Sequence, residues 1–336
     1  MTTTVSVPGR VVLGGDHSKL LGGSIVAAAI DLRVRVTLAD RTDDRVTIEG
    51  PLANTSAPLD TVFEGDDVDD SLVVSAADRD LAVFPLLRRV LADVGLDDPS
   101  AVAGFDVGIE ADSDLELGVG LASSTAVIAG LWAAVHDHFD DRLADDELAE
   151  TVAEIEADLY ADASIADPRA VVHGGVVHAD ANGSVSRADL SAPVVLGVGQ
   201  PKTTRDEIEA HVADLASELG PLFETVGDLA DSVTAELWAS VREEDPARTR
   251  TLLTFYGDVL ETLGLASWPI PGARATGVAR DADAGVKQSD FGHRATLVGV
   301  PASDEDAVAL ERAFAGSLNP TVTEIDGSGV RYHDVT

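Results

Sequence analysis

Apolar residues occupy every second position over residues 32–38 and again over 105–109. Period-two spacing of this kind predicts half-buried β-strands, and the apolar run at 11–13 fits a further strand. The apolar stretch SIVAAAIDL at 24–32 is compatible with a strand or with a short helix. The pattern therefore predicts a strand-rich start of the chain and leaves residues 24–32 open.

From residue 123 the spacing of apolar residues changes to three or four positions. Val127, Leu131 and Val135 form one stripe, and a second stripe follows over 148–159. Such spacing places apolar side chains on one face of a helix. Two consecutive helices are therefore predicted.

The second half of the chain alternates strands and helices. An Asn-Gly turn at 182–183 predicts a hairpin within 173–190. Beyond it the patterns predict strand, helices, strand, helix and strand, over residues 193–198, 204–265, 295–300, 303–316 and 320–334. This order is typical of a small α+β sandwich with helices on one sheet face. Because 336 residues exceed the size of one growing core, we expect two domains, 1–185 and 186–336.

Acidic residues far outnumber basic ones, with 60 against 23 and a formal net charge of -37. This charge repels nucleic acid phosphates and anionic membrane surfaces, so we expect neither as a partner. The acids are spread through every segment, which is typical of a hydrated surface in a halophilic protein. No apolar run reaches the roughly 20 residues of a membrane helix, and the N-terminus lacks a signal core. A cytoplasmic location is expected.

Cysteine is absent, which excludes disulfides, thiolate nucleophiles and zinc bound by cysteine. The eight histidines are dispersed, and His136 and His138 are spaced so that they do not share a helical face. A metal bound by imidazole is therefore not expected.

The strongest chemical pattern is DLELGVGLASSTAVIAGLWAAV at 114–135, where glycines and small residues precede a predicted helix. Free N–H groups at a helix start bind anions, and small residues let a polyphosphate approach. An ordinary serine-capped helix after a glycine turn gives the same pattern. The candidate phosphate-binding residues are Gly118, Val119, Gly120, Leu121, Ala122, Ser123 and Ser124.

GVGLASSTA resembles the phosphate-binding motif of the GHMP kinases, usually written G-x-G-L-G-S-S-A-A, with Ala122 where most members have glycine. Residues 7–23, VPGRVVLGGDHSKLLGG, are similar to the first motif of mevalonate kinases and galactokinases, P-G-K/R-V-x-L-x-G-E-H. Arg10 stands where mevalonate kinases carry lysine, and Asp16 where they carry glutamate. The chain thus resembles the GHMP kinases, and within them most closely the mevalonate kinases of halophilic archaea.

A third match concerns two carboxylates. Mevalonate kinases place a magnesium-binding glutamate eleven residues before a catalytic aspartate, with two glycines seven and eight residues after it. Glu156 and Asp167 have this separation, and Gly174 and Gly175 follow at the same offsets. A single carboxylate carries little weight in so acidic a chain, whereas the ordered set matches the family.

The third GHMP motif is altered. Mevalonate kinases have K-L-T-G-A-G-G-G-G there, and this chain has KQSDFGHR at 287–294, in which only Gly292 remains of the glycines. Bulky and charged residues stand where backbone would approach phosphate. This departure leaves open which substrate the protein binds and whether it turns that substrate over. Arg294 is a candidate side chain for binding phosphate oxygens.

The resemblance implies an α+β GHMP kinase fold, with an N-terminal ribosomal protein S5-like β/α domain and a C-terminal ferredoxin-like α/β sandwich. It also implies a site for ATP and Mg²⁺. The backbone of residues 118–124 would hold the ATP phosphates, and Ser124 with Glu156 would hold Mg²⁺. Asp167 would act on the substrate hydroxyl beside the positive charge of Arg10.

Asp16, His17 and Lys19 would contact the substrate. The implied reaction converts mevalonate to 5-phosphomevalonate, in isoprenoid precursor synthesis. Two alternatives stay open: a kinase for another small alcohol, such as a sugar, homoserine or phosphomevalonate, and a non-catalytic paralogue that binds a nucleotide or metabolite. The expected partner is a small-molecule alcohol. A homodimer is compatible with the family, and the sequence does not decide it.

Overall fold

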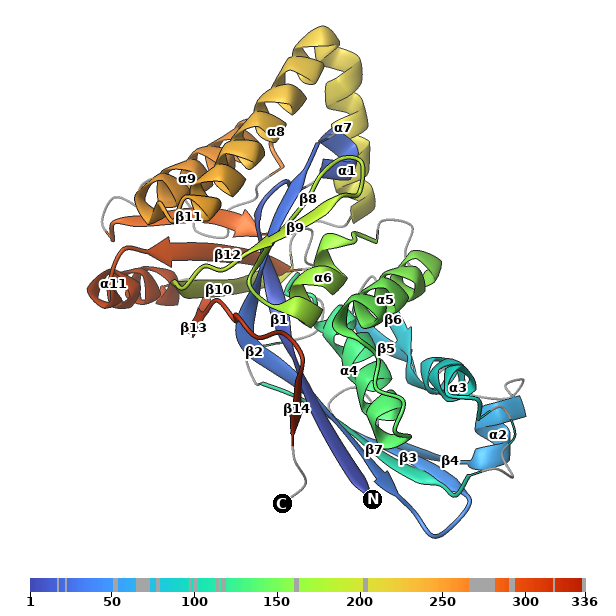
Figure 1. Cartoon of the computed structure of the whole chain (residues 1–336). Coiled ribbons are helices and arrows are strands. Elements are labelled where there is room, and N and C mark those ends of the chain that lie inside the picture. The colour runs from blue at the N-terminus through green and yellow to red at the C-terminus, as the bar shows by residue number, and fades with distance from the viewer. Residues whose placement is uncertain are drawn as a thin grey trace.

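The structure, a computed structural model, describes residues 1–333 apart from several short segments. The segments outside the description are 17, 22, 51–53, 65–72, 77–78, 97, 99–101, 113–114, 116–118, 160–162, 202–204, 266–281, 290–293 and 317. Two larger sheets, covered by helices, organise the described part of the chain (Figure 1).

Eight of the described strands form the larger sheet, in the order β14-β1-β2-β7-β3-β4, with β8 paired to β2 and β9 paired to β8. Their bounds are β1 Thr2–Gly14, β2 Ile25–Asp40, β3 Arg45–Glu49, β4 Thr55–Pro58, β7 Phe105–Ala111, β8 Val176–Ala179, β9 Val185–Ala188 and β14 Arg331–His333. The long strands β1 and β2 run side by side through the molecule (Figure 1). A separate pair joins β5 Val73–Ala76 to β6 Arg79–Ala82.

Residues 25–32, which the sequence pattern left open, are part of β2. This strand is paired on one side with β1 and on the other with β8 and β7. Residues 26–30 are fully buried, so both faces of the strand are covered. A strand buried on both faces reads as a continuous apolar run, which explains why periodicity did not identify it.

Helices α4 Ser123–His138 and α6 Ala166–His173 pack against the larger sheet, whereas α3 Val83–Asp93 packs on α4 and α5 Asp145–Leu159 packs on α4 and α6. Helix α4 lies directly against β1 and β2, and its predicted stripe at Val127, Leu131 and Val135 is buried. Trp132 is buried as well, so α4 is enclosed on nearly every side. A short helix α2 Leu59–Glu64 contacts α3, β3 and β4, whereas the one-turn helix α1 Ser18–Leu21 contacts α8 Pro221–Arg242.

The second sheet has the order β11-β12-β10-β13. Its strands are β10 Pro193–Pro201, β11 Ala284–Ser289, β12 Arg294–Pro301 and β13 Asn319–Glu324, and its helices are α7 Arg205–Leu219, α8 Pro221–Arg242, α9 Pro246–Thr262 and α11 Asp304–Ala315. Leu310 of α11 abuts Gly299, whereas α9 abuts Gly285 and Lys287 on the opposite side of the sheet. The helices therefore contact both faces of this sheet, not one face as expected.

The predicted final strand at 320–334 is two strands, because the chain leaves the second sheet after β13 and returns to the first. There β14 pairs with β1, with Thr4 opposite His333, so the two ends of the chain lie side by side (Figure 1). The division of the chain into domains at residue 185 stays a prediction. No described helix has both the length and the apolar character needed to span a membrane.

Two glycines after α6 explain the Gly-Gly pair in the sequence. Gly174 and Gly175 have φ of +70° and +75°, a region that favours glycine. A Cβ on Gly174 would lie 2.4 Å from the backbone nitrogen of Gly329 and 2.7 Å from that of Ser328. By contrast, Gly183 in the β8–β9 turn has φ of +82° with nothing within 4 Å of its Cβ position.

These two environments predict different costs for the same substitution. We expect Gly183→Ala to lower the free energy of unfolding by about 1–2 kcal/mol, the cost of a left-handed alanine. Gly174→Ala adds a backbone clash and should cost about 2–5 kcal/mol. Urea unfolding at fixed KCl concentration measures both, and equal losses in the two variants would contradict this account of the pair.

Candidate active site

Arg10 and Asp167 form a buried ion pair across 157 residues of sequence. Arg10 lies on β1, and Asp167 lies in the first turn of α6. The Nε and Nη2 groups of Arg10 donate to the two carboxylate oxygens of Asp167 at 2.7 and 2.5 Å. The residues are 4% and 9% exposed. A paired contact of this kind fixes the orientation of the carboxylate as well as its position.

The same arginine contacts the loop before α4. Its Nη1 group donates to the carbonyl of Gly120 at 2.8 Å, and its backbone N–H donates to the carbonyl of Leu121 at 2.9 Å. Arg10 therefore contacts both Asp167 and the loop before α4. The carboxylate and the predicted phosphate site lie close together, as a transfer between a bound phosphate and a hydroxyl requires.

The loop before α4 has a left-handed backbone at two positions. Gly120 has φ of +77°, and Ala122, the residue that caps α4, has φ of +56°. Ala122 stands where the family motif has glycine, and its conformation is the one that glycine adopts without strain. The motif position therefore has a backbone role that the alanine keeps. Gly118 lies outside the described residues.

The first turn of α4 offers free backbone donors. The helix begins at Ser123, and among the described residues no side chain caps it. Val119 and Leu121 are fully buried and anchor the loop in the core, while Ser124 is half-buried. Uncapped N–H groups at the start of a sixteen-residue helix, with the helix dipole behind them, are suited to bind an anion.

Glu156 of α5 contacts α4 next to this turn. The hydroxyl of Thr125 donates to Oε1 of Glu156 at 2.5 Å, and both residues are about 2% exposed. Ser124, the predicted partner of Glu156 at a metal, directly precedes Thr125. The sequence pattern did not single out Thr125, and its only signal was its place after the two serines.

The oxygen atoms of Glu156, Thr125 and Ser124 are suitable ligands for Mg²⁺. Within the described ranges no three His, Asp or Glu side chains come together as a metal-binding group. Magnesium is commonly held by one or two carboxylates together with substrate phosphates, so a single buried glutamate beside hydroxyl oxygens at a phosphate site suits it. The chemistry of Glu156, Thr125 and Ser124 is therefore compatible with the predicted metal.

Asp16, predicted to contact the substrate, is in a second buried ion pair. Its Oδ2 atom lies 2.5 Å from Nζ of Lys287, and the two side chains are 1% and 0% exposed. Lys287 Nζ also donates to the carbonyl of Val12 at 2.9 Å. The first residue of the altered third motif thus connects β11 of the second sheet to the end of β1. The sequence analysis missed this contact.

Tyr256 of α9 lies beside this pair. Its hydroxyl donates to the backbone carbonyl of Asp16 at 3.0 Å, and Lys287 Nζ lies 5.7 Å from the centre of its ring. Burial, followed by the negative charge of Asp16, raises the pKa of Tyr256 well above its usual value. The phenol therefore stays protonated and keeps its role as a donor.

Two hydroxyl groups of the second sheet form hydrogen bonds with β1 and with the loop before α4. Ser289 Oγ accepts a hydrogen bond from the backbone N–H of Val12 at 3.0 Å. Thr296 donates to the carbonyl of Val119, in the loop before α4, at 2.7 Å. The second sheet therefore fixes both β1 and the loop before α4, although its own loop at 290–293 lies outside the described residues.

Three further predictions cannot be placed. His17 lies outside the described residues, as do the side chains of Lys19 and Arg294. The residues that come together are Arg10, Asp167, Gly120 and Leu121, with Thr125 and Glu156 in contact on the neighbouring helices.

Comparison with known proteins shows which sequences and folds this chain is similar to. Residues 83–175 match the family model described as GHMP kinases N terminal domain. The chain is 24% identical to the mevalonate kinase of Thermococcus sibiricus, over 100% of this chain and 99% of that protein. It is 24% identical to the mevalonate kinase of Pyrococcus abyssi, over 98% and 97% of the two chains.

Solved structures show the same fold. A crystal structure of a mevalonate kinase superposes with a TM-score of 0.75 at 16% identity, covering 97% of this chain and 99% of that one. The mevalonate kinase of Methanococcus jannaschii gives 0.72 at 16% identity over 98% of each chain. The galactokinase of Lactococcus lactis, complexed with galactose, gives 0.73 at 15% identity over 98% and 95%. Residues 83–175 thus match the N-terminal domain of the GHMP kinases, and the chain as a whole has the GHMP kinase fold.

Proposed function

We propose that this chain is an ATP-dependent kinase that phosphorylates mevalonate to 5-phosphomevalonate. The observation that carries the proposal is Arg10, which contacts both Asp167 and the loop before α4. It joins a carboxylate suited to a hydroxyl substrate with a helix start suited to a polyphosphate. The name of the full-length relatives supports mevalonate as the acceptor.

The nucleotide would be held by backbone groups. The N–H groups of residues 119–124 would bind the ATP phosphates, and Glu156 with the neighbouring hydroxyls of Ser124 and Thr125 would hold Mg²⁺. When bound, the metal neutralises phosphate charge. Few basic side chains are available in this acidic chain, so backbone donors and the metal would supply most of the charge stabilisation.

Asp167 would orient the acceptor hydroxyl and accept its proton. Phosphoryl transfer has a loose transition state, so positioning and charge stabilisation account for most of the catalysis. Arg10 fixes the Asp167 carboxylate through two hydrogen bonds, and its fixed positive charge lies beside the loop where the phosphates would bind. The remaining lone pairs of the carboxylate would face the substrate.

An acceptor screen tests the proposal. Purified protein in molar KCl with ATP and Mg²⁺ should release ADP when mevalonate is added, as measured by a coupled ADP assay. A panel of sugars, homoserine and phosphomevalonate should give at least about tenfold lower kcat/KM, since a site built to bind one polar acceptor discriminates strongly. If ADP is released only with another member of the panel, that compound replaces mevalonate as the acceptor, and the assignment as a kinase stands.

The altered third motif supports a second candidate. Lys287 is fully buried in an ion pair, and the segment after it has one glycine where the motif has several. A non-catalytic paralogue would bind ATP and release no ADP with any acceptor. That combination in the same assay would favour a nucleotide or metabolite sensor over the kinase.

A further inference from the structure

A cavity lies on the outer side of α6, away from the Arg10–Asp167 pair. Its volume is about 470 Å³, and it lies open to solvent between α6, the first turn of α5 and the β8–β9 hairpin. Arg169 and His173 of α6 and Arg187 of β9 line it, in a chain that has only 23 basic residues against 60 acids. Two arginines and a histidine in one cavity are therefore unusual for this protein.

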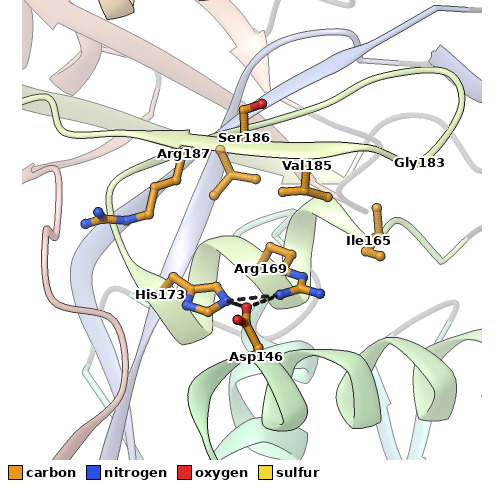
Figure 2. A pocket seen from close by; sticks show the side chains of 9 residues that line it. Asp146, Ile165, Arg169, His173, Gly183, Val185, Ser186 and Arg187 are labelled. Atoms are coloured by element: carbon orange, nitrogen blue, oxygen red, sulfur yellow. Dashed lines mark hydrogen bonds and ion pairs between the residues drawn. The ribbon is translucent and has the colours of Figure 1, made fainter.

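The chain's own carboxylate occupies the basic part of the cavity. Asp146 of α5 lies 2.5 Å from Nη1 of Arg169 and 3.2 Å from Nε2 of His173 (Figure 2). The Asp146 side chain is 80% exposed, whereas those of Arg169 and His173 are 14% and 21% exposed. Arg169 and His173 are thus mostly buried, whereas the Asp146 carboxylate that contacts them is exposed to solvent. An exposed carboxylate held this way is weakly bound and replaceable.

Arg169 has capacity for a further acceptor. Its Nη2 group contacts the exposed Glu150 at 3.0 Å, and its buried Nε–H has no hydrogen-bond acceptor among the described residues. Guanidinium groups bind phosphate oxygens through two donors at once, and Nη1 and Nη2 of Arg169 are the two donors that now contact exposed carboxylates.

The rest of the cavity has an apolar part, next to Ser186 and Arg187 of β9. Ile165, Val177 and Val185 line it, and Figure 2 shows Ile165 and Val185 on the side away from Arg187. A cavity of this volume is larger than a phosphate ion needs, and an apolar wall suits a hydrocarbon group. We propose that this cavity binds the phosphate monoester of a small organic molecule, with the phosphate on Arg169 and His173 in place of Asp146 and the organic group against the three apolar side chains.

Titration calorimetry in molar KCl tests the site with butyl phosphate as the probe. Arg169→Gln should weaken butyl phosphate binding at least about tenfold, because it removes the forked donor. Asp146→Asn should strengthen it about threefold or more, because it removes the competing charge. Arg89→Gln is the matched control, since Arg89 pairs with Asp158 on the exposed surface, and it should leave the affinity unchanged.

The opposite signs separate a ligand site from a structural ion pair. If Arg169→Gln does not fold, Asp146→Asn decides alone, because its exposed side chain can change without loss of the core. Unchanged or weaker butyl phosphate binding in Asp146→Asn would overturn the proposal. Equal affinity for inorganic phosphate and butyl phosphate would overturn the organic part of the ligand, and no binding of either would overturn the site. The test measures binding only, so its outcome is independent of kinase activity.

The pH dependence provides a second readout. Burial, with the charges of Arg169 and Arg187, lowers the pKa of His173, and Asp145 and Asp146 act in the opposite direction. The histidine is therefore neutral at pH 7 and gains its charge at lower pH. Sulfate, whose charge is constant in this range, should bind more tightly as the pH falls from 8 to 6, and His173→Gln should abolish this change. A pH-independent sulfate affinity would remove His173 from the site.

Discussion

Asp167→Asn should lower kcat for ADP formation by about 10²–10⁴-fold, the range for loss of a positioned general base. Asparagine keeps the shape of the side chain and removes the proton acceptor, so the chemical step is affected more than binding. ATP is expected to bind with little change, because its phosphates would contact backbone groups at the start of α4. Steady-state ADP assays and a fluorescent-nucleotide titration in molar KCl measure the two quantities.

Two variants control this experiment. Asp158→Asn changes an exposed carboxylate that pairs with Arg89, and it should keep full activity. Arg10→Lys keeps a positive charge beside Asp167 and loses the paired hydrogen bonds, so we expect a smaller loss than in Asp167→Asn. An Asp167→Asn protein that is folded, binds ATP and turns over at the normal rate would remove Asp167 from the mechanism.

Much of the fold could be predicted because short-range patterns report burial on one face. Strands with one solvated face, such as β7, and helices with a regular stripe, such as α4, were identified from spacing alone. The start of β2 was ambiguous because both of its faces are buried. The return of β14 to β1 was missed because pairing between residues more than 300 positions apart leaves no local pattern.

The candidate site was predictable only where a family motif marked it. Arg10, Asp167 and the loop before α4 were found through the GHMP resemblance, and the structure brings them into contact. The partner of Asp16 was not predictable, since 60 acids give no indication of which one a lysine contacts. One signal was present: Lys287 is among only three lysines in the chain, and a lysine kept in an arginine-rich sequence indicates a specific position.

This buried contact also carries the largest expected effect on stability. Lys287→Met should lower the free energy of unfolding by about 3–5 kcal/mol, because it leaves the Asp16 carboxylate buried without its cation. Solvent ions screen a buried pair much less than an exposed one, so the loss should persist at high KCl concentration. Urea unfolding followed by circular dichroism measures the change at two KCl concentrations.

A double variant separates the pair from general damage to the core. In Lys287→Met with Asp16→Asn no buried charge is left, so part of the lost stability should return and the two single effects should not add. Arg248→Met is the control for an exposed arginine, which pairs with Glu236 and Glu243, and it should cost less than about 1 kcal/mol. If Lys287→Met costs no more than Arg248→Met, the ion pair does not hold β11 to β1. Additive losses in the double variant would show instead that Asp16 and Lys287 stabilise the protein separately, through their other contacts.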